Sequence, residues 1–157
     1  MRQDLRLYLS AFLSLLFVFA TPCLLQAHPH NGRLKIVITG FASDQGVVKI
    51  GLVSTKEAFE ARRSVKEGYT GVTVDIKDGK IEYVFEGIPY GEYAIKYYHD
   101  ENGNDRLDAN FLGIPKERYG FSNNARALLG PPSFERAKFI FKDDDMVHAM
   151  KIAEGDS

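Results

Sequence analysis

Two alternating runs joined by a turn limit most strongly what this chain can fold into. Apolar and polar residues alternate over 72–77 and again over 80–85, with Asp78-Gly79 between them. Alternation of this kind is typical of half-buried strands, and Asp-Gly is a favoured hairpin turn because both positions tolerate a positive φ. A two-residue turn would place Ile76 opposite Ile81 and all the apolar side chains on one face. The same register pairs Val74 with Tyr83 and Val72 with Phe85.

Similar runs recur along the chain and predict an all-β domain. Turn-forming residues separate them, for example Ser43-Asp44-Gln45-Gly46. With the hairpin included, seven strands are expected, at 33–42, 46–54, 72–77, 80–85, 92–98, 136–142 and 146–153. Seven short strands in a segment of this size favour an antiparallel β-sandwich.

One short helix is expected after the second strand. Ser54-Thr55-Lys56-Glu57 has the spacing of a capping box, in which a hydroxyl and a carboxylate three residues apart bond to each other's backbone amides. The following residues, 58–63, favour a helix. We expect Phe59 to pack over a sheet edge.

The first 27 residues have the three-part layout of a secretory signal. Basic residues precede an apolar run over 7–25, and Ala27 supplies the small residue that a signal peptidase needs. About 18 apolar residues can cross a bilayer, but Pro22 breaks the helix near its end. We therefore expect cleavage after Ala27, with lipid attachment at Cys23 as an alternative.

Cleavage would leave 28–157 as a single domain without a transmembrane span, located in the periplasm or secreted. The formal charge of the whole chain is only −1, and no basic stripe is visible. Nucleic-acid binding needs such a stripe, so we expect none. The expected partner is a component of the cell envelope or of the extracellular space.

A segment of 35 residues, 99–133, has no convincing strand pattern. Connections between elements usually span about 4 to 6 residues, so a loop of this length needs its own source of order. Its side chains are the first place to look for that source.

Oxygen-bearing side chains at the start of this loop have the spacing of a cation-binding frame. Asp100, Asn102, Asn104 and Asp108 fall at positions 1, 3, 5 and 9, and Arg106 falls at position 7, which usually offers its backbone carbonyl. Calcium takes six to eight oxygen ligands, so the pattern predicts a calcium-stabilised loop over 100–108.

Two positions depart from that frame. Asp105 stands where glycine is expected, although aspartate tolerates a left-handed conformation better than most residues. Phe111 stands where a bidentate glutamate is expected, and Glu117 could fold back to supply the carboxylate. A metal-free loop, in which Asp and Asn side chains cap local amides, is the alternative.

The same loop resembles a known family. The resemblance rests on three runs of residues: His99-Asp100-Glu101-Asn102-x-Asn104-x-x-Leu107-Asp108, then Leu112-Gly113-Ile114-Pro115-x-Glu117-x-x-Gly120-Phe121-Ser122-Asn123-Asn124, and upstream Gly87-Ile88-Pro89-x-Gly91-x-Tyr93-Ala94. The chain is similar to the exported bacterial proteins of domain of unknown function 2141 (DUF2141), whose pattern commonly has glycine at the position of Asp105. The resemblance implies a β-sandwich of the prealbumin-like type and no established activity, and we expect the strands to follow an immunoglobulin-like or prealbumin-like Greek key.

The leading hypothesis is a non-enzymatic accessory or binding domain whose long loop forms the functional surface. Five residues of the loop are candidates for contacting a ligand: His99, Glu117, Tyr119, Phe121 and Asn123. The competing hypothesis is a periplasmic metalloenzyme or hydrolase that uses His99 as a general base.

Overall fold

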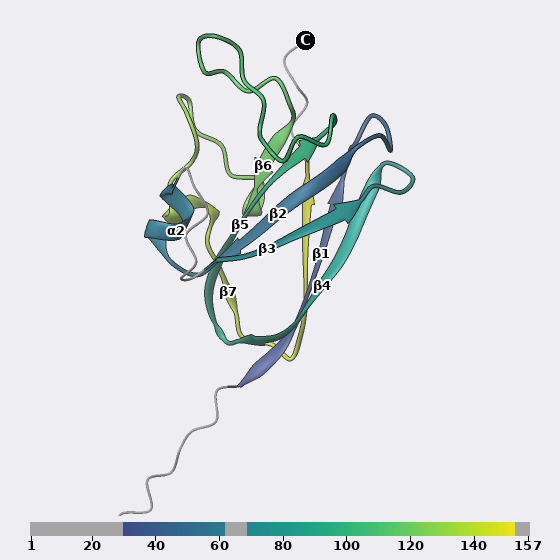
Figure 1. Ribbon diagram of the computed structural model, residues 1–157. Coiled ribbons are helices and arrows are strands. Elements are labelled where there is room, and N and C mark those ends of the chain that lie inside the picture. The colour runs from purple at the N-terminus through teal and green to yellow at the C-terminus, as the bar shows by residue number, and fades with distance from the viewer. Residues whose placement is uncertain (1–29, 62–68, 153–157) are drawn as a thin grey trace, which may run out of the picture.

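The computed structural model describes residues 30–61 and 69–152 as a two-sheet β-sandwich (Figure 1). The expected signal segment lies outside these residues, as do the last residues of the expected helix and the last residue of the final expected strand. Within the described residues, no helix has the length and apolar character needed to cross a membrane.

The smaller sheet has three strands, β1 (Asn31–Thr39), β4 (Lys80–Pro89) and β8 (Asp145–Lys151), in the order β4-β1-β8. β1 pairs antiparallel with β4 but parallel with β8. The parallel pair departs from the predicted antiparallel sandwich. Parallel pairing needs a long crossover between the two strands, and here the rest of the domain provides it.

The larger sheet has five strands, in the order β3-β2-β5 with two short strands along the far edge of β5. These strands are β2 (Val47–Val53), β3 (Tyr69–Asp75), β5 (Gly91–Asp100), β6 (Tyr119–Phe121) and β7 (Phe139–Phe141). β6 pairs with the second half of β5 and β7 with the first half. The described residues therefore contain eight strands instead of seven, and β6 lies in the segment expected to have none.

The predicted hairpin forms its turn but not its strand pairing. Lys77 and Lys80 exchange backbone hydrogen bonds of 2.9 and 3.1 Å, and Asp78 and Gly79 both adopt positive φ, at 53° and 70°. Beyond this bridge the two runs separate, because β3 pairs with β2 and β4 pairs with β1. The bridge has the register that would place Ile76 opposite Ile81, but no strand pairing of β3 with β4 continues it, so the expected paired hairpin is wrong beyond the turn.

The apolar side chains of the separated strands still share one core. β3 and β4 belong to opposite sheets, and each turns its alternating apolar residues toward the space between them. Ile76, Ile81 and Phe85 are buried there, and Val72, Val74 and Tyr83 pack against them. Inward alternation is satisfied equally well by a hairpin or by two facing strands, which is why the pattern alone did not distinguish them.

Two short helices, α2 (Lys56–Glu60) and α3 (Phe134–Ala137), lie beside the larger sheet. The N-cap of α2 is Thr55, whose hydroxyl accepts from the backbone amide of Ala58, so the expected capping box at Ser54 is wrong by one residue. α3 occupies the first part of a predicted strand and buries Phe134 and Ala137. Phe59 packs against Phe134 with ring centroids 5.8 Å apart, in a second apolar cluster.

Candidate functional site

The β5–β6 connection, residues 101–118, forms the large green loop at the top of Figure 1. It starts from Asp100, the last residue of β5, which is fully buried. The carboxylate of Asp100 accepts backbone N–H bonds from Gly103 at 2.8 Å, Asn104 at 3.1 Å and Asp105 at 2.9 Å. One side chain thus satisfies three consecutive amides and fixes the first turn of the loop.

Asp105 adopts the left-handed backbone conformation that glycine usually provides in a cation-binding loop, with φ at 61°. Aspartate populates this region more readily than most residues, so the turn forms without glycine. The Asp105 carboxylate also forms an ion pair with Lys49 of β2, which ties the loop to the sheet below it.

Two asparagines hold the carboxylate of Asp108. Asn102 Nδ2 donates to Asp108 Oδ2 at 2.7 Å, and Asn104 Nδ2 donates to Oδ1 at 3.0 Å. These hydrogen bonds, from Asn104 first and then Asn102, lower the pKa of Asp108, with smaller contributions from Lys116 and Arg106. Asp108 is therefore held as a carboxylate at the centre of the loop.

The oxygen of each asparagine accepts an amide two residues farther along the chain. Asn102 Oδ1 accepts from the N–H of Asn104 at 3.1 Å, and Asn104 Oδ1 accepts from the N–H of Arg106 at 2.8 Å. These are Asx turns, the local caps expected for a metal-free loop. Arg106 joins the cluster through its N–H and not through the predicted carbonyl.

Glu117 folds back onto the start of the loop, as the sequence had suggested it could. Its side chain is buried, and its two oxygens accept from the N–H of Glu101 at 3.1 Å and of Asp108 at 2.9 Å. Both ends of the segment predicted to bind a cation, 100–108, are therefore joined to one carboxylate. Glu117 supports the frame from beneath and is too buried to be a surface contact for a large ligand.

His99 is buried beside this frame, on β5. Its Nε2 lies 2.6 Å from the carbonyl oxygen of Gln45, and its ring meets Phe41 edge-on at 5.4 Å. Its Nδ1 has no hydrogen-bond partner among the described residues and lies 3.5 Å from Glu101 Oε1. The side chain is only 1% exposed, so a substrate in solvent cannot reach it in this conformation.

The remaining predicted contact residues have structural roles. Tyr119 and Phe121 are half-buried in β6, and the Phe121 ring lies 5.6 Å from that of Phe59. Asn123 Nδ2 donates to the carbonyls of Ala137 at 3.1 Å and Lys138 at 2.8 Å, at the end of α3. The structure does not bring these three side chains together with the Asp100–Asp108 frame as one surface.

The frame retains oxygen atoms that could hold a cation. A carboxylate offers about four lone pairs, of which Asp100 uses three for amides and Asp108 uses two. Among residues 30–61 and 69–152, no group of three or more His, Cys, Asp or Glu side chains is placed to hold a metal. A cation in this loop would therefore also need amide or carbonyl oxygens, which calcium accepts and softer metals do not favour.

The apex of the β5–β6 connection, residues 110–114, is an apolar tip that the sequence did not indicate as a binding surface. Asn110 Oδ1 accepts from the amides of Leu112 at 2.9 Å and Ile114 at 3.0 Å, and the N–H of Asn110 donates to the Ile114 carbonyl at 2.8 Å. These bonds close a tight turn with Phe111 and Leu112 at its apex. The available signal was the run Phe111-Leu112-Gly113-Ile114, which is apolar within a polar loop.

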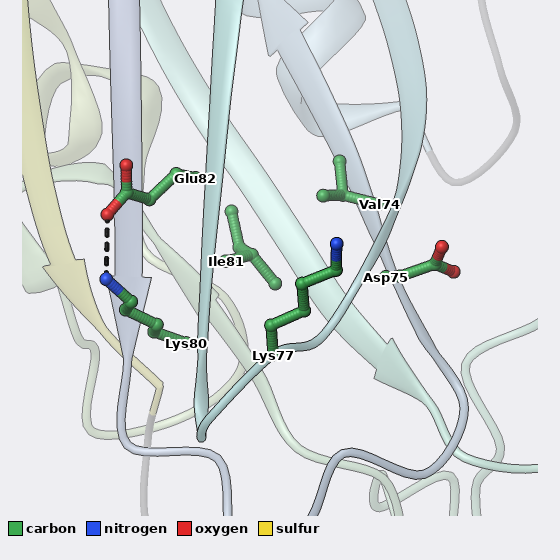
Figure 2. Close-up of a pocket in the computed structure, with 6 residues that line it drawn as sticks. All are labelled: Val74, Asp75, Lys77, Lys80, Ile81 and Glu82. Carbon is green, nitrogen blue, oxygen red and sulfur yellow. Dashed lines mark hydrogen bonds and ion pairs between the residues drawn. The ribbon is translucent and has the colours of Figure 1, made fainter.

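A separate hollow of about 320 Å³ lies where β3 and β4 separate. Figure 2 shows Val74 and Ile81 facing each other across it, while Asp75 points away. Lys35 and Lys80 hold Glu82 at the rim and lower its pKa to about 2. The hollow is an opening between the sheets with charges paired along one edge, and it contains none of the residues predicted to bind a ligand.

These observations define the chain as a two-sheet β-sandwich domain that carries a side-chain-organised loop at one end. The sequence profile of DUF2141, described as an uncharacterized protein conserved in bacteria, matches residues 36–148. The match covers well over half of the chain, so the protein belongs to this family. No curated protein and no solved structure matches it.

Proposed function

We propose that this protein is an exported, non-enzymatic binding domain of the bacterial cell envelope, with the β5–β6 connection as its functional surface. Export rests on the signal-like layout of residues 1–27. The sandwich provides a rigid base, and in finer detail we propose that it is a Greek-key sandwich of the immunoglobulin-like or prealbumin-like type. The partner is a component of the envelope or of the medium outside the cell.

The observation that carries this proposal is that buried side chains of the loop hydrogen-bond to the loop's own backbone and fix its conformation. Two buried carboxylates, Asp100 and Glu117, together accept five backbone amides of the connection. Long loops of a compact domain that are ordered in this way are commonly functional, because a connection alone could be much shorter. The scaffold holds the loop clear of the sheets, where a partner can reach it.

Calcium is the proposed ligand of the frame. Asp100, Asn102, Asn104 and Asp108 supply side-chain oxygens, and rotation of the two asparagine amides would turn their oxygens toward Asp108. Arg106 would contribute its carbonyl, as the frame requires. The internal hydrogen bonds give the loop its shape in the absence of the ion, and calcium would replace the two amide donors as the counterpart of the Asp108 carboxylate.

Thermal melting tests the calcium proposal. The processed protein is melted in millimolar calcium and again in chelator, beside an Asp108→Asn variant and an Asp143→Asn control. We expect calcium to raise the Tm of the wild type and of the control, and to have little effect on Asp108→Asn, because that change removes a charged ligand. Identical Tm values for the wild type in calcium and chelator would contradict the proposal. The mass of the exported protein tests the expected start at His28.

The competing proposal is an enzyme that uses His99, and the burial of that side chain does not favour it. His99 is covered by Phe41 and bonded to Gln45, and the hydroxyl of Ser122, which could otherwise serve as a nucleophile, is fully buried. The Ser122 hydroxyl accepts from the N–H of Ile95 at 2.8 Å and donates to the carbonyl of Ala137 at 2.6 Å. A metal content tied to His99, or turnover lost in His99→Ala, would revive it.

A further inference from the structure

Two asparagines of the chain are followed by glycine, the neighbour that most favours intramolecular deamidation. In this reaction the backbone nitrogen of the following residue attacks the side-chain carbon Cγ of asparagine, and glycine leaves that nitrogen unhindered because it has no side chain. The pairs are Asn31-Gly32, in β1, and Asn102-Gly103, in the β5–β6 connection. The fold gives these two pairs very different surroundings.

The pair Asn31-Gly32 is confined on both sides. Both residues pair with β4 in the antiparallel register of the smaller sheet. A Cβ on Gly32 would lie 2.8 Å from the backbone oxygens of Asp143 and Asp144, so the backbone here is also packed against the turn before β8. Ring closure would require this backbone to rotate out of the strand. We therefore expect the pair to be unreactive while the protein is folded.

The Asn102 side chain, in contrast, already curls over the backbone that would attack it. Its Oδ1 accepts from the N–H of Asn104 at 3.1 Å, which draws the side chain over the intervening Gly103. Gly103 has φ at 72°, and a Cβ there would meet nothing within 4 Å, so no neighbour obstructs its rotation. Holding a nucleophile beside its target speeds an intramolecular reaction.

The proton and the leaving group of this reaction each have a place to go. The Gly103 N–H donates to Asp100 Oδ1 at 2.8 Å, which is within the reach of a general base. The leaving group is the Asn102 Nδ2 amide, which belongs to an exposed residue and donates to Asp108. Ammonia formed there can pass directly into solvent.

We propose that Asn102 is a deamidation site, at which the loop converts one of its own amides into a carboxylate. The Gly103 nitrogen forms a bond to Asn102 Cγ, the Cγ–Nδ2 bond breaks, and the displaced proton leaves with Nδ2 as ammonia. Water then opens the cyclic imide at either of its carbonyls. The product is aspartate or isoaspartate, and both carry a new carboxylate.

The consequence for the loop rests on the proposed calcium site. A carboxylate at position 102 cannot donate to Asp108, so two negative charges would face each other where an amide now donates at 2.7 Å. Calcium binds carboxylate oxygens and would relieve that repulsion. The deamidated loop would therefore require calcium for the order that the unmodified loop obtains from its own side chains.

Peptide mass spectrometry of the processed protein, incubated at neutral pH, tests the modification. We expect replacement of NH₂ by OH at Asn102 to be at least about tenfold faster than at Asn31 in the folded protein, and the two rates to be similar in urea. Gly103→Ala should slow the change at Asn102 by at least about tenfold, because its side chain hinders the attack. The matched control is Gly130→Ala, at a residue with φ at 70° and equally open space, and should leave the rate unchanged. Equal rates at Asn102 and Asn31 in the folded protein would overturn the proposal.

Thermal melting of Asn102→Asp, which imitates one product, tests the consequence. Compared with the wild type, it should have a lower Tm in chelator and a larger rise of Tm in calcium, whereas the control Asn31→Asp should show the wild-type rise. Calcium stabilisation of the wild type, with Asn102 as unreactive as Asn31, would contradict the deamidation inference alone. Rapid change at Asn102, with equal Tm values of Asn102→Asp in calcium and chelator, would contradict the calcium proposal alone.

Discussion

Asp100 and Glu117 show how single residues can order a long connection. A carboxylate accepts several hydrogen bonds at once, and hydrogen bonds to a charged acceptor are stronger than those between neutral groups. Burial makes these bonds costly to lose, because the amides would then have no partner. The sequence indicated both residues as candidate ligand or support positions, but it could not show how many amides each one satisfies.

Replacing Asp100 should be far more damaging than replacing an exposed aspartate. We predict that Asp100→Ala lowers the free energy of unfolding by about 3 kcal/mol or more, since three amides lose a charged acceptor. The control, Asp145→Ala, removes the exposed partner of Arg33 and should cost less than about 1 kcal/mol. Urea denaturation measures both. Similar losses in the two variants would mean that Asp100 does not organise the loop.

His148 predicts a dependence of stability on pH. It stacks on Phe139 at 4.3 Å, its Nε2 accepts from the N–H of Asn123 at 3.3 Å, and burial lowers its pKa. Because the folded pKa lies below the unfolded value of about 6.5, the unfolded state takes up the proton first. Its contribution is complete above about pH 6.5, falls as the pH drops below that value, and levels off below the folded pKa.

Urea midpoints measured on either side of this range test the prediction. The wild type should lose more stability than His148→Gln between about pH 7.5 and about pH 5.5, because glutamine does not titrate there. The comparison isolates His148 from the other groups that titrate. Equal losses in both proteins would contradict the assignment.

At the scale of elements, the β1–β2 turn and the start of the β5–β6 connection are packed backbone against backbone. A Cβ on Gly46 would overlap the carbonyl oxygen of Asp100 and lie 2.7 Å from the Cα of Glu101. Gly87 has a similar positive φ, at 65° against 78°, but a Cβ there meets nothing within 4 Å. Alanine at Gly87 would therefore show the cost of the positive φ alone, and alanine at Gly46 would show that cost together with the close backbone contact.

We predict that Gly87→Ala costs about 1 kcal/mol, the penalty for a left-handed alanine. Gly46→Ala carries the same penalty and also a backbone clash that no side chain can relieve, so it should cost at least about 3 kcal/mol. Urea denaturation measures the difference. A Gly46→Ala variant no less stable than Gly87→Ala would show that the turn and the connection are not in close contact.

Local patterns predicted elements better than they predicted pairing. The turn at Asp78-Gly79 was predicted because two positive φ angles suit those residues, and Phe59 packs at the side of the larger sheet as its helix suggested. The pairing of β3 with β4 was wrong because alternation states which face is buried but not which sheet a strand joins. β6, at three residues, is too short to produce a periodic signal, whereas β7 falls within the strand expected at 136–142.

At the scale of the whole molecule, the sandwich carries the β5–β6 connection at one end. The hollow between β3 and β4 is a separate feature and shares no residue with that loop. The local spacing of Asp100, Asn102, Asn104 and Asp108 predicted a calcium site, and the structure brings these four residues into one hydrogen-bonded cluster, while the ion itself stays a prediction. The sequence missed the exposed tip, because an apolar run such as Phe111-Leu112 reads equally well as a core anchor until the fold shows which side faces solvent.

Amide hydrogen exchange of the processed protein tests the central proposal, a functional loop that its own side chains order and that calcium stabilises further. The connection, residues 101–118, is compared in millimolar calcium and in chelator. We predict slower exchange in calcium within this segment, with the strands of the sandwich unchanged, because the ion would bind oxygen ligands from several parts of the loop and hold them together. Exchange of the segment at the same rate in both conditions would contradict it.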